Sequence, residues 1–391
     1  MKKTFSKYIT EFLKKESSSG ILLAFATILA FIVANSKFNE MYFGLLNFKI
    51  LGLSTQLWVN DALMAIFFFV IGLEIKREVV SGELSTPKKA LLPLLCALGG
   101  MVFPALIYLY FNPGLPVSKG WGIPMATDIA FAVGILSFLG PRVPFSLKIL
   151  LLAIAIVDDL GAILAIAFFY TAEIRNIGLA IAALGICMIL GMRTLGFNKY
   201  RYFIPIGGLV WFGFLYSGVH ATIAGVILGL LTPVTLKLKD KGLKTLEPVN
   251  DLIHKLHPFT SFLIMPIFAF ANAGVDLSGM IFSDVFFNPI YVGIVAGLVV
   301  GKPFGILITS FVAHKMKLVS LPSQVTWAHI ISIGLLAGIG FTMSLFISSL
   351  ALPANLEIYS KVGIITASLL SGLAGFLLLK TNIKYSVAKP L

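Results

Sequence analysis

Long apolar stretches recur from one end of this 391-residue chain to the other. Most run for about 17–25 residues, the length that a helix needs to cross the roughly 30 Å hydrocarbon core of a membrane. Hydrophobic residues make up 58% of the sequence and charged residues 12%, whereas a soluble domain carries about 25% charged residues. The sequence therefore predicts an all-α polytopic membrane protein.

Hydrophobicity predicts twelve transmembrane helices. The expected spans are 18–35, 57–73, 90–110, 121–139, 147–170, 177–190, 202–217, 219–231, 259–275, 289–312, 327–350 and 360–380. Most of the 30 lysines and arginines fall in the two termini and in the loops after even-numbered spans. Because basic residues gather on the cytoplasmic side of a membrane, both termini are expected in the cytoplasm. The net charge of +13 has the same cause, so we expect membrane lipids and no nucleic acid as partners.

The spans leave no room for an inserted soluble domain. We expect one membrane transporter domain over residues 1–391, with the twelve-span region at 18–380. Residues 1–17 predict an amphipathic cytoplasmic helix that leads into the first span, and residues 381–391 a short cytoplasmic tail.

Four ionisable residues fall deep inside the expected spans. Asp158 and Asp159 are adjacent at the centre of span five, Asp128 is in span four and Lys302 in span ten. Each charge at that depth costs roughly 2.5–3.5 kcal/mol on insertion scales. A structural salt bridge would account for Lys302 and one aspartate, but it leaves two carboxylates. Such an excess of negative charge needs a mobile cation, and hard oxygen ligands suit Na⁺, H⁺, Mg²⁺ or Ca²⁺. No resident cofactor is expected.

Adjacent side chains on a helix point about 100° apart. We therefore expect one member of the Asp158–Asp159 pair to contact Lys302 and the other to face a cavity shared with Asp128. Two close carboxylates in a low dielectric do not ionise together easily, so protons can compete there with a cation.

Helix-breaking residues interrupt two spans at similar depth. They are Gly122 and Pro124 before Thr127 and Asp128 in span four, and Gly338, Gly340 and Thr342 in span eleven. Glycines in one membrane helix would indicate close packing. Interruptions in two spans are typical of transporters whose discontinuous helices cross at an ion site near the midplane. Spans 3–5 and 10–12 would then be inverted repeats.

Two other classes of protein use buried acids. A monovalent cation channel needs a continuous polar pore, whereas these spans offer a single polar layer. An intramembrane aspartyl protease needs two acids on separate helices to activate water. Asp128 and Asp159 could provide them, although the Gly-x-Gly-Asp signature is missing and Lys302 would neutralise the pair. Neither class explains both breaks, which favour a secondary transporter and not an enzyme.

The sequence resembles the NhaA family of bacterial Na⁺/H⁺ antiporters from about residue 8 to 380. The segments that carry the resemblance are NDALMAIFFFVIGLEIKRE (60–78), GIPMATDIAFAVG (122–134), AIVDDLGAI (155–163), GVHATIAGV (218–226), LHPFTSFLIMPIFAFANAGV (256–275), GKPFGI (301–306) and LLAGIGFTMSLFI (335–347). The resemblance implies electrogenic export of Na⁺ or Li⁺ in exchange for protons, with activation at alkaline pH. Such exchange would serve sodium and pH homeostasis. The resemblance also implies a homodimer in the bacterial inner membrane.

The resemblance also implies roles for particular residues. Asp128 and Asp159 would bind the transported Na⁺, with Thr127 beside them, and Asp158 would pair with Lys302. Matches to residues of the family's pH-regulating funnel are Glu74, Arg77, Glu78, His254, His257 and His220, and Asp61 matches a buried acid at the outer end of span two. Residues 37–56, which could form an external hairpin around Gly52, are shorter than the family's dimer-forming hairpin.

Overall fold

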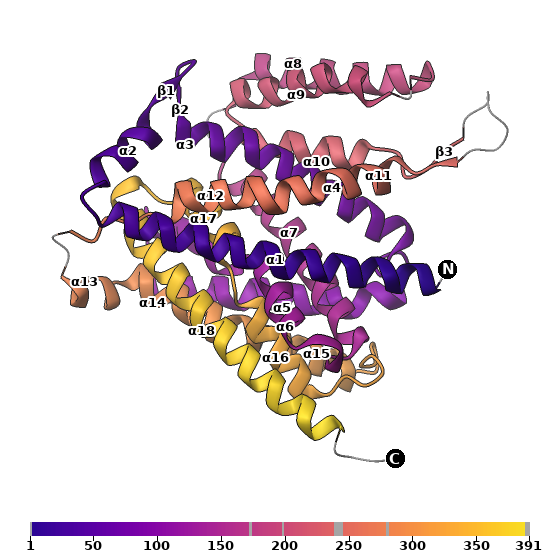
Figure 1. The fold of residues 1–391 in the computed structure, drawn as a ribbon, viewed down its shortest axis with the longest axis vertical. Helices are drawn as coiled ribbons and strands as arrows, with labels where there is room; N and C mark the ends of the chain where they lie inside the picture. The colour runs from indigo at the N-terminus through magenta and orange to yellow at the C-terminus, as the bar shows by residue number, and fades with distance from the viewer. Residues whose placement is uncertain (1, 172–173, 198, 238–244, 279–280, 388–391) are drawn as a thin grey trace. The chain divides into compact units, whose positions relative to one another are not determined.

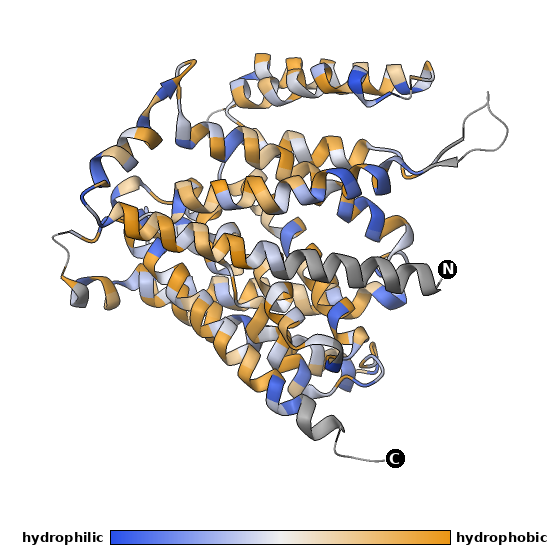
Figure 2. Cartoon of the chain, viewed as in Figure 1, coloured by the Kyte–Doolittle hydropathy of each residue, from blue (hydrophilic) through white to orange (hydrophobic). Residues whose placement is uncertain are grey.

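The computed structural model describes residues 2–171, 174–197, 199–237, 245–278 and 281–387 (Figure 1). Helices dominate, and the only strands within these residues form two hairpins of two residues per strand. Hydrophobic residues line most of the helices, with hydrophilic residues at many helix ends (Figure 2). The prediction of an all-α polytopic membrane protein is confirmed.

The chain forms two compact units, which are described separately. Unit 1 comprises Met1–Leu45, Ser81–Ala162 and Met265–Leu391, and unit 2 comprises Leu46–Val80 and Ile163–Ile264. α4, which begins in unit 2, ends in unit 1; α2 and α7 begin in unit 1 and end in unit 2. The single transporter domain expected over residues 1–391 stays a prediction.

Unit 1 contains most of the helices. They are α1 (Lys2–Ala34), α2 (Asn39–Asn47), α5 (Pro87–Phe111), α6 (Ile129–Phe138), α7 (Phe145–Phe169), α12 (Met265–Ala273), α13 (Phe282–Phe286), α14 (Pro289–Ala296), α15 (Lys302–Lys315), α16 (Trp327–Ala337), α17 (Phe341–Ala351) and α18 (Ala354–Val387), with 3-10 turns at Val117–Met125 and Gly140–Arg142 and a π turn at Gly297–Gly301. Within this unit α15 packs against α5, α1 against α6 and α12, and α18 against α14, α16 and α17.

Unit 2 contains the remaining helices and both hairpins. Its elements are β1 (Lys49–Ile50), β2 (Leu53–Ser54), α3 (Thr55–Trp58), α4 (Met64–Ser81), α8 (Asn176–Thr194), α9 (Phe203–Ser217), α10 (Thr222–Leu231), β3 (Leu236–Lys237), β4 (Thr245–Leu246) and α11 (Pro248–Phe259), with π turns at Val59–Leu63 and Thr260–Ile264 and a 3-10 turn at Tyr200–Tyr202. The β1–β2 hairpin turns at Leu51 and Gly52, which both have positive φ, as the tight primed turns of hairpins require.

The expected spans all coincide with helical segments, but not all are long. Among the described residues, eight helices are long and apolar enough to cross a membrane, or up to ten if each of two bent pairs is one span. The count of twelve therefore stays a prediction, as do the inverted repeats. The amphipathic face of residues 1–17 falls on side chains outside those described. Of the expected tail, residues 388–391 also lie outside the described chain.

Both expected interruptions are present in unit 1. The 3-10 turn Val117–Met125 precedes α6, and residues 126–128 between them are not helical. α16 and α17 meet at an angle of 48° across residues 338–340. Proline has no amide hydrogen and glycine costs helix stability, so Pro124, Gly338 and Gly340 account for where the helices stop.

Glycines allow two helices of unit 1 to approach closely. A Cβ atom at Gly305 of α15 would lie 2.1 Å from the carbonyl oxygen of Gly99 on α5. That distance is far inside van der Waals contact, so the two backbones can meet only because neither residue has a side chain.

We expect Gly305→Ala to lower the free energy of unfolding by about 1–3 kcal/mol, because a methyl group overpacks this contact. Gly208→Ala on α9 is the matched control, since a Cβ atom there meets nothing within 4 Å and alanine favours a helix. Melting temperatures of the purified proteins in detergent would measure both. Equal melting temperatures for the two variants would contradict this account of the packing.

Candidate functional site

The two interruptions of unit 1 contact each other through their backbones. The amide of Asp128 donates a hydrogen bond to the carbonyl of Ile339 at 2.7 Å, and the Thr127 hydroxyl donates to the carbonyl of Ala337 at 2.9 Å. Ala126, directly before them, has an extended backbone. The non-helical residues of one interruption therefore satisfy carbonyl groups that the end of α16 leaves open.

Asp128 lies at the N-termini of two helices. Its Oδ1 accepts a hydrogen bond from the Phe131 amide at 3.1 Å, which caps α6. Its Oδ2 accepts from the amide of Thr342 at 3.1 Å and from the Thr342 hydroxyl at 2.5 Å, in the first turn of α17. Helix N-termini carry partial positive charge, so this arrangement stabilises the ionised form of a carboxylate that is only 1% exposed.

Lys302 and Asp158 form a fully buried ion pair. The Lys302 ammonium lies 2.9 Å from Asp158 Oδ2, and both side chains are 0% exposed. Lys302 also donates to the carbonyl of Met125 at 2.5 Å, and Thr127 Oγ1 lies 2.7 Å from the same Asp158 oxygen. The pair is thus attached to the interruption that precedes α6.

The two carboxyl oxygens of Asp158 differ in their hydrogen bonding. Asp158 Oδ1 is buried and has no hydrogen-bond partner among the residues that the structure describes. A buried acceptor normally has a partner. This oxygen could therefore accept a further donor or ligand.

Asp159 follows Asp158 on α7 and is 2% exposed. Lys302 experiences the charge of Asp159 as well as that of Asp158. Three buried carboxylates and one lysine therefore belong to the same unit, and together they carry excess negative charge when all are ionised. Over the described residues, no group of three or more His, Cys, Asp and Glu side chains could hold a resident metal ion.

The other residues that the sequence singled out lie in unit 2. Arg77 and Glu78 of α4 form an ion pair of 3.5 Å, and a ring nitrogen of His220 lies 2.8 Å from the carbonyl of Tyr170. The carbonyl of Asp61 accepts a hydrogen bond from the Trp211 indole at 3.1 Å. Glu74 is on α4, and His254 and His257 are on α11.

Some partners of the buried charges were not identified from the sequence. The sequence places Thr342 in an interruption without identifying it as a ligand of Asp128, although a hydroxyl two residues after Gly340 is a usable signal. The Met125 carbonyl that accepts from Lys302 gives no signal, because every residue has a carbonyl group.

Comparison with known proteins gives matches along nearly the whole chain. The sequence model of the family described as Na⁺/H⁺ antiporter 1 matches residues 10–379. The chain is 48% identical over 382 residues to the Na(+)/H(+) antiporter NhaA of Shewanella loihica, covering 95% of this chain and 96% of that protein. It is 44% identical over 390 residues to the Na(+)/H(+) antiporter NhaA of Pelagibacter ubique, covering 97% and 98%. For the Na(+)/H(+) antiporter NhaA 2 of Pseudomonas syringae pv. syringae, the identity is 48% over 377 residues, with 95% of each chain covered.

The buried ion pair generates a prediction about stability. Lys302→Ala should lower the free energy of unfolding by about 3–5 kcal/mol, because Asp158 would remain buried without its counter-ion. The double variant Lys302→Ala/Asp158→Ala should recover part of this loss. Lys255→Ala is the control, since its partner Asp251 is 43% exposed and such surface pairs contribute about 0–1 kcal/mol. Thermal unfolding in detergent would measure all three, and a Lys302→Ala variant as stable as Lys255→Ala would contradict the prediction.

Proposed function

Because this chain belongs to the Na⁺/H⁺ antiporter 1 family, we propose that it is a secondary transporter that exports Na⁺ in exchange for protons. Its relatives are named as antiporters and not as enzymes. Na⁺ and H⁺ are then substrates, and no resident cofactor takes part.

One observation supports the proposal most strongly: a buried carboxylate lies where two interrupted helices meet. Asp128 is held at the N-termini of α6 and α17, and the Lys302–Asp158 pair is attached to the same interruption through Thr127 and Met125. Oxygen ligands of this kind suit a small hard cation. Discontinuous helices at such sites are typical of secondary transporters.

We assign cation binding to Asp128 and Asp159, with Thr127 beside them. Both carboxylates must be ionised to bind Na⁺, so protons compete with the cation for the same oxygens. This competition couples the two substrates, since loading with protons releases Na⁺ and loading with Na⁺ releases protons.

We assign a second role to the Lys302–Asp158 pair. Lys302 neutralises one carboxylate of the cluster and leaves the other two for the cation. If Asp158 or Lys302 also exchanges a proton during the cycle, more protons enter than cations leave. Exchange would then be electrogenic, and the membrane potential would drive it.

The remaining assignments follow from the family and not from the geometry of the carboxylates. We propose that the protein lies in the bacterial inner membrane with both termini in the cytoplasm and acts as a homodimer. We also propose that it transports Li⁺ and is activated at alkaline pH. Glu74, Arg77, Glu78, His220, His254 and His257 would take part in that regulation. Asp61, which is half-buried, would correspond to the family's acid at the outer end of span two.

The cation-site assignment is tested by replacing the carboxylates. Asp159→Asn and Asp128→Asn keep the side-chain size but remove a ligand charge, so Na⁺-dependent proton release should fall at least about 100-fold, as loss of a charged buried partner implies. Everted vesicles with a pH-sensitive dye, challenged with Na⁺, Li⁺ and K⁺ between about pH 6.5 and 8.5, would measure it.

Asp284→Asn is the control, because Asp284 is exposed on α13. It should exchange at the wild-type rate. Normal exchange with near-normal apparent affinity in Asp159→Asn would remove this residue from the site. Inactivity of the wild-type protein toward all three cations would overturn the proposed function.

Electrogenic exchange predicts dependence on membrane potential. Moving one net charge through 100 mV yields about 2.3 kcal/mol, which exceeds the roughly 1.4 kcal/mol that two protons per cycle cost against half an opposing pH unit. Na⁺ efflux from proteoliposomes should therefore continue against a mildly inverted pH gradient when the interior is negative. It should stop when valinomycin and equal K⁺ concentrations hold the potential at zero. Tracer Na⁺ would measure the efflux, and an unchanged rate and final Na⁺ ratio under the clamp would show electroneutral exchange.

A further inference from the structure

The first turn of α17 has no cap of its own. The residue before it is Gly340, which has no side chain to accept a hydrogen bond, and no side-chain cap is formed there. The first amides of a helix have no acceptor within the helix. In the interior of this protein, the amides of Phe341 and Thr342 must find acceptors on other elements.

Two different elements supply those acceptors. The amide of Phe341 donates to the hydroxyl of Ser368 on α18 at 3.1 Å. The amide of the next residue, Thr342, donates to Asp128 at 3.1 Å. Neighbouring amides of one helix terminus are thus divided between a neutral serine and the carboxylate assigned to the cation.

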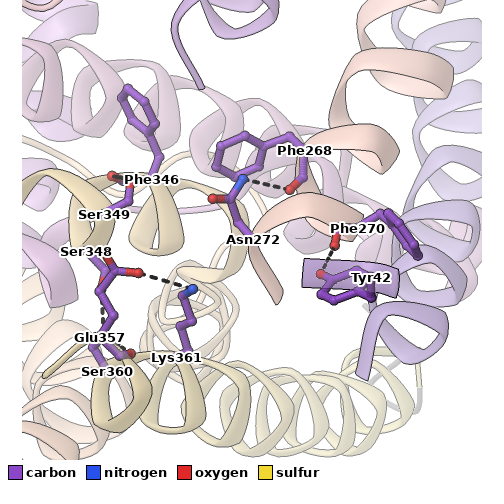
Figure 3. Close-up of polar contacts among 10 residues, drawn as sticks. All are labelled: Tyr42, Phe268, Phe270, Asn272, Phe346, Ser348, Ser349, Glu357, Ser360 and Lys361. Carbon is purple, nitrogen blue, oxygen red and sulfur yellow. Dashed lines mark hydrogen bonds and ion pairs between the residues drawn. The ribbon is translucent and has the colours of Figure 1, made fainter. Parts of the chain in front are cut away.

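Ser368 lies on α18, a helix that packs along both halves of the broken span. α18 packs against α16 and α17, and Ser360 contacts Ser348 of α17 about two turns before Ser368 (Figure 3). Near the start of α18, Glu357 and Lys361 form an ion pair of 3.1 Å, with side chains 19% and 13% exposed (Figure 3). Ser368 itself is 8% exposed, so water does not readily take its place.

We propose that Ser368 is a positioning residue for the cation site: by accepting the Phe341 amide, it holds the first turn of α17 so that Thr342 meets Asp128 while leaving that carboxylate available to the cation. The inference rests on the proposed function, since it assigns Asp128 to the transported ion. This role requires a neutral hydrogen-bond acceptor at position 368 of α18.

Loss of the hydroxyl has a defined consequence. The Phe341 amide would lose its acceptor while it lies next to the Thr342 amide, which donates to the Asp128 carboxylate. Either Asp128 also accepts from Phe341, or the first turn of α17 shifts and Thr342 moves. In both cases the oxygens of Asp128 are less well placed for a cation, so Na⁺ binding should weaken more than the maximal rate.

The test is Na⁺-dependent exchange in proteoliposomes with Ser368→Ala. We expect the apparent KM for Na⁺ to rise on the order of tenfold, as for a buried amide left unpaired, while the rate at saturating Na⁺ changes less than about twofold. Ser368→Thr keeps the hydroxyl and should restore the wild-type KM. A residue that only stabilised the fold would lower the amount of active protein and leave KM unchanged.

Ser371→Ala is the matched control. Ser371 is on the same helix beside the same interruption, since a Cβ atom at Gly338 would lie 2.8 Å from its hydroxyl oxygen. That hydroxyl is buried and has no hydrogen-bond partner within the described chain, so its removal should leave KM unchanged. If Ser368→Ala does not fold, Ser368→Cys provides a side chain of similar size with a weak acceptor and should show the same rise in KM.

The possible results distinguish a failure of this inference from a failure of the proposed function. Exchange by the wild type with an unchanged KM in a folded Ser368→Ala or Ser368→Cys variant overturns this inference alone. An equal rise in Ser371→Ala also overturns it, since the effect would then not depend on the hydrogen bond. A wild-type protein without Na⁺-dependent exchange overturns the proposed function and this inference with it.

Discussion

Water is absent from the hydrocarbon core of a membrane, so every amide, carbonyl and charge at that depth needs a partner within the protein. An interrupted helix increases this demand, because each new helix end leaves open donors or acceptors. Here the two interruptions satisfy each other: the Asp128 amide and the Thr127 hydroxyl bind carbonyls at the end of α16. The Asp128 carboxylate, in turn, accepts amides at the starts of α6 and α17. The polar groups that an ion site requires are therefore the same groups that make the interruptions stable.

The buried lysine depends on the same arrangement. An ion pair removed from water loses more hydration energy than its mutual attraction returns, unless further hydrogen bonds satisfy its remaining donors and acceptors. Lys302 has both the Asp158 carboxylate and the Met125 carbonyl as partners, and Thr127 adds a hydroxyl beside Asp158. Met125 and Thr127 stand in the non-helical or 3-10 residues before α6. A regular helix would have used the Met125 carbonyl in its own ladder, so the interruption is what makes that acceptor available to the lysine.

The sequence predicted the fold class and the residues of the buried charge cluster because both leave a local signal. Apolar stretches of membrane length and charged residues within them are visible in one dimension. The hydrogen-bond partners were less predictable, since Thr342 and Asp128 are 214 residues apart and Lys302 and Met125 are 177 residues apart. Ser368 gave no signal at all, because a serine on a membrane helix commonly bonds to its own backbone. The number of spans is also not fixed by hydrophobicity: α10 has 10 residues, too few to cross the core as a regular helix.

On the proposed assignment, cation binding and helix capping compete for the same oxygens. Asp128 has two oxygens, and in the described structure Oδ1 accepts from α6 while Oδ2 accepts from α17. A cation that binds this carboxylate must share lone pairs with those helix ends, and a proton that binds it removes the charge that both ends favour. Loading the site with Na⁺ or with H⁺ therefore changes how firmly the two half-helices are held to one residue. The identity of the bound ion can therefore bias the position of the broken helices directly. An antiporter requires such a bias, because its site must cross the membrane in one direction with Na⁺ bound and in the other direction with protons bound.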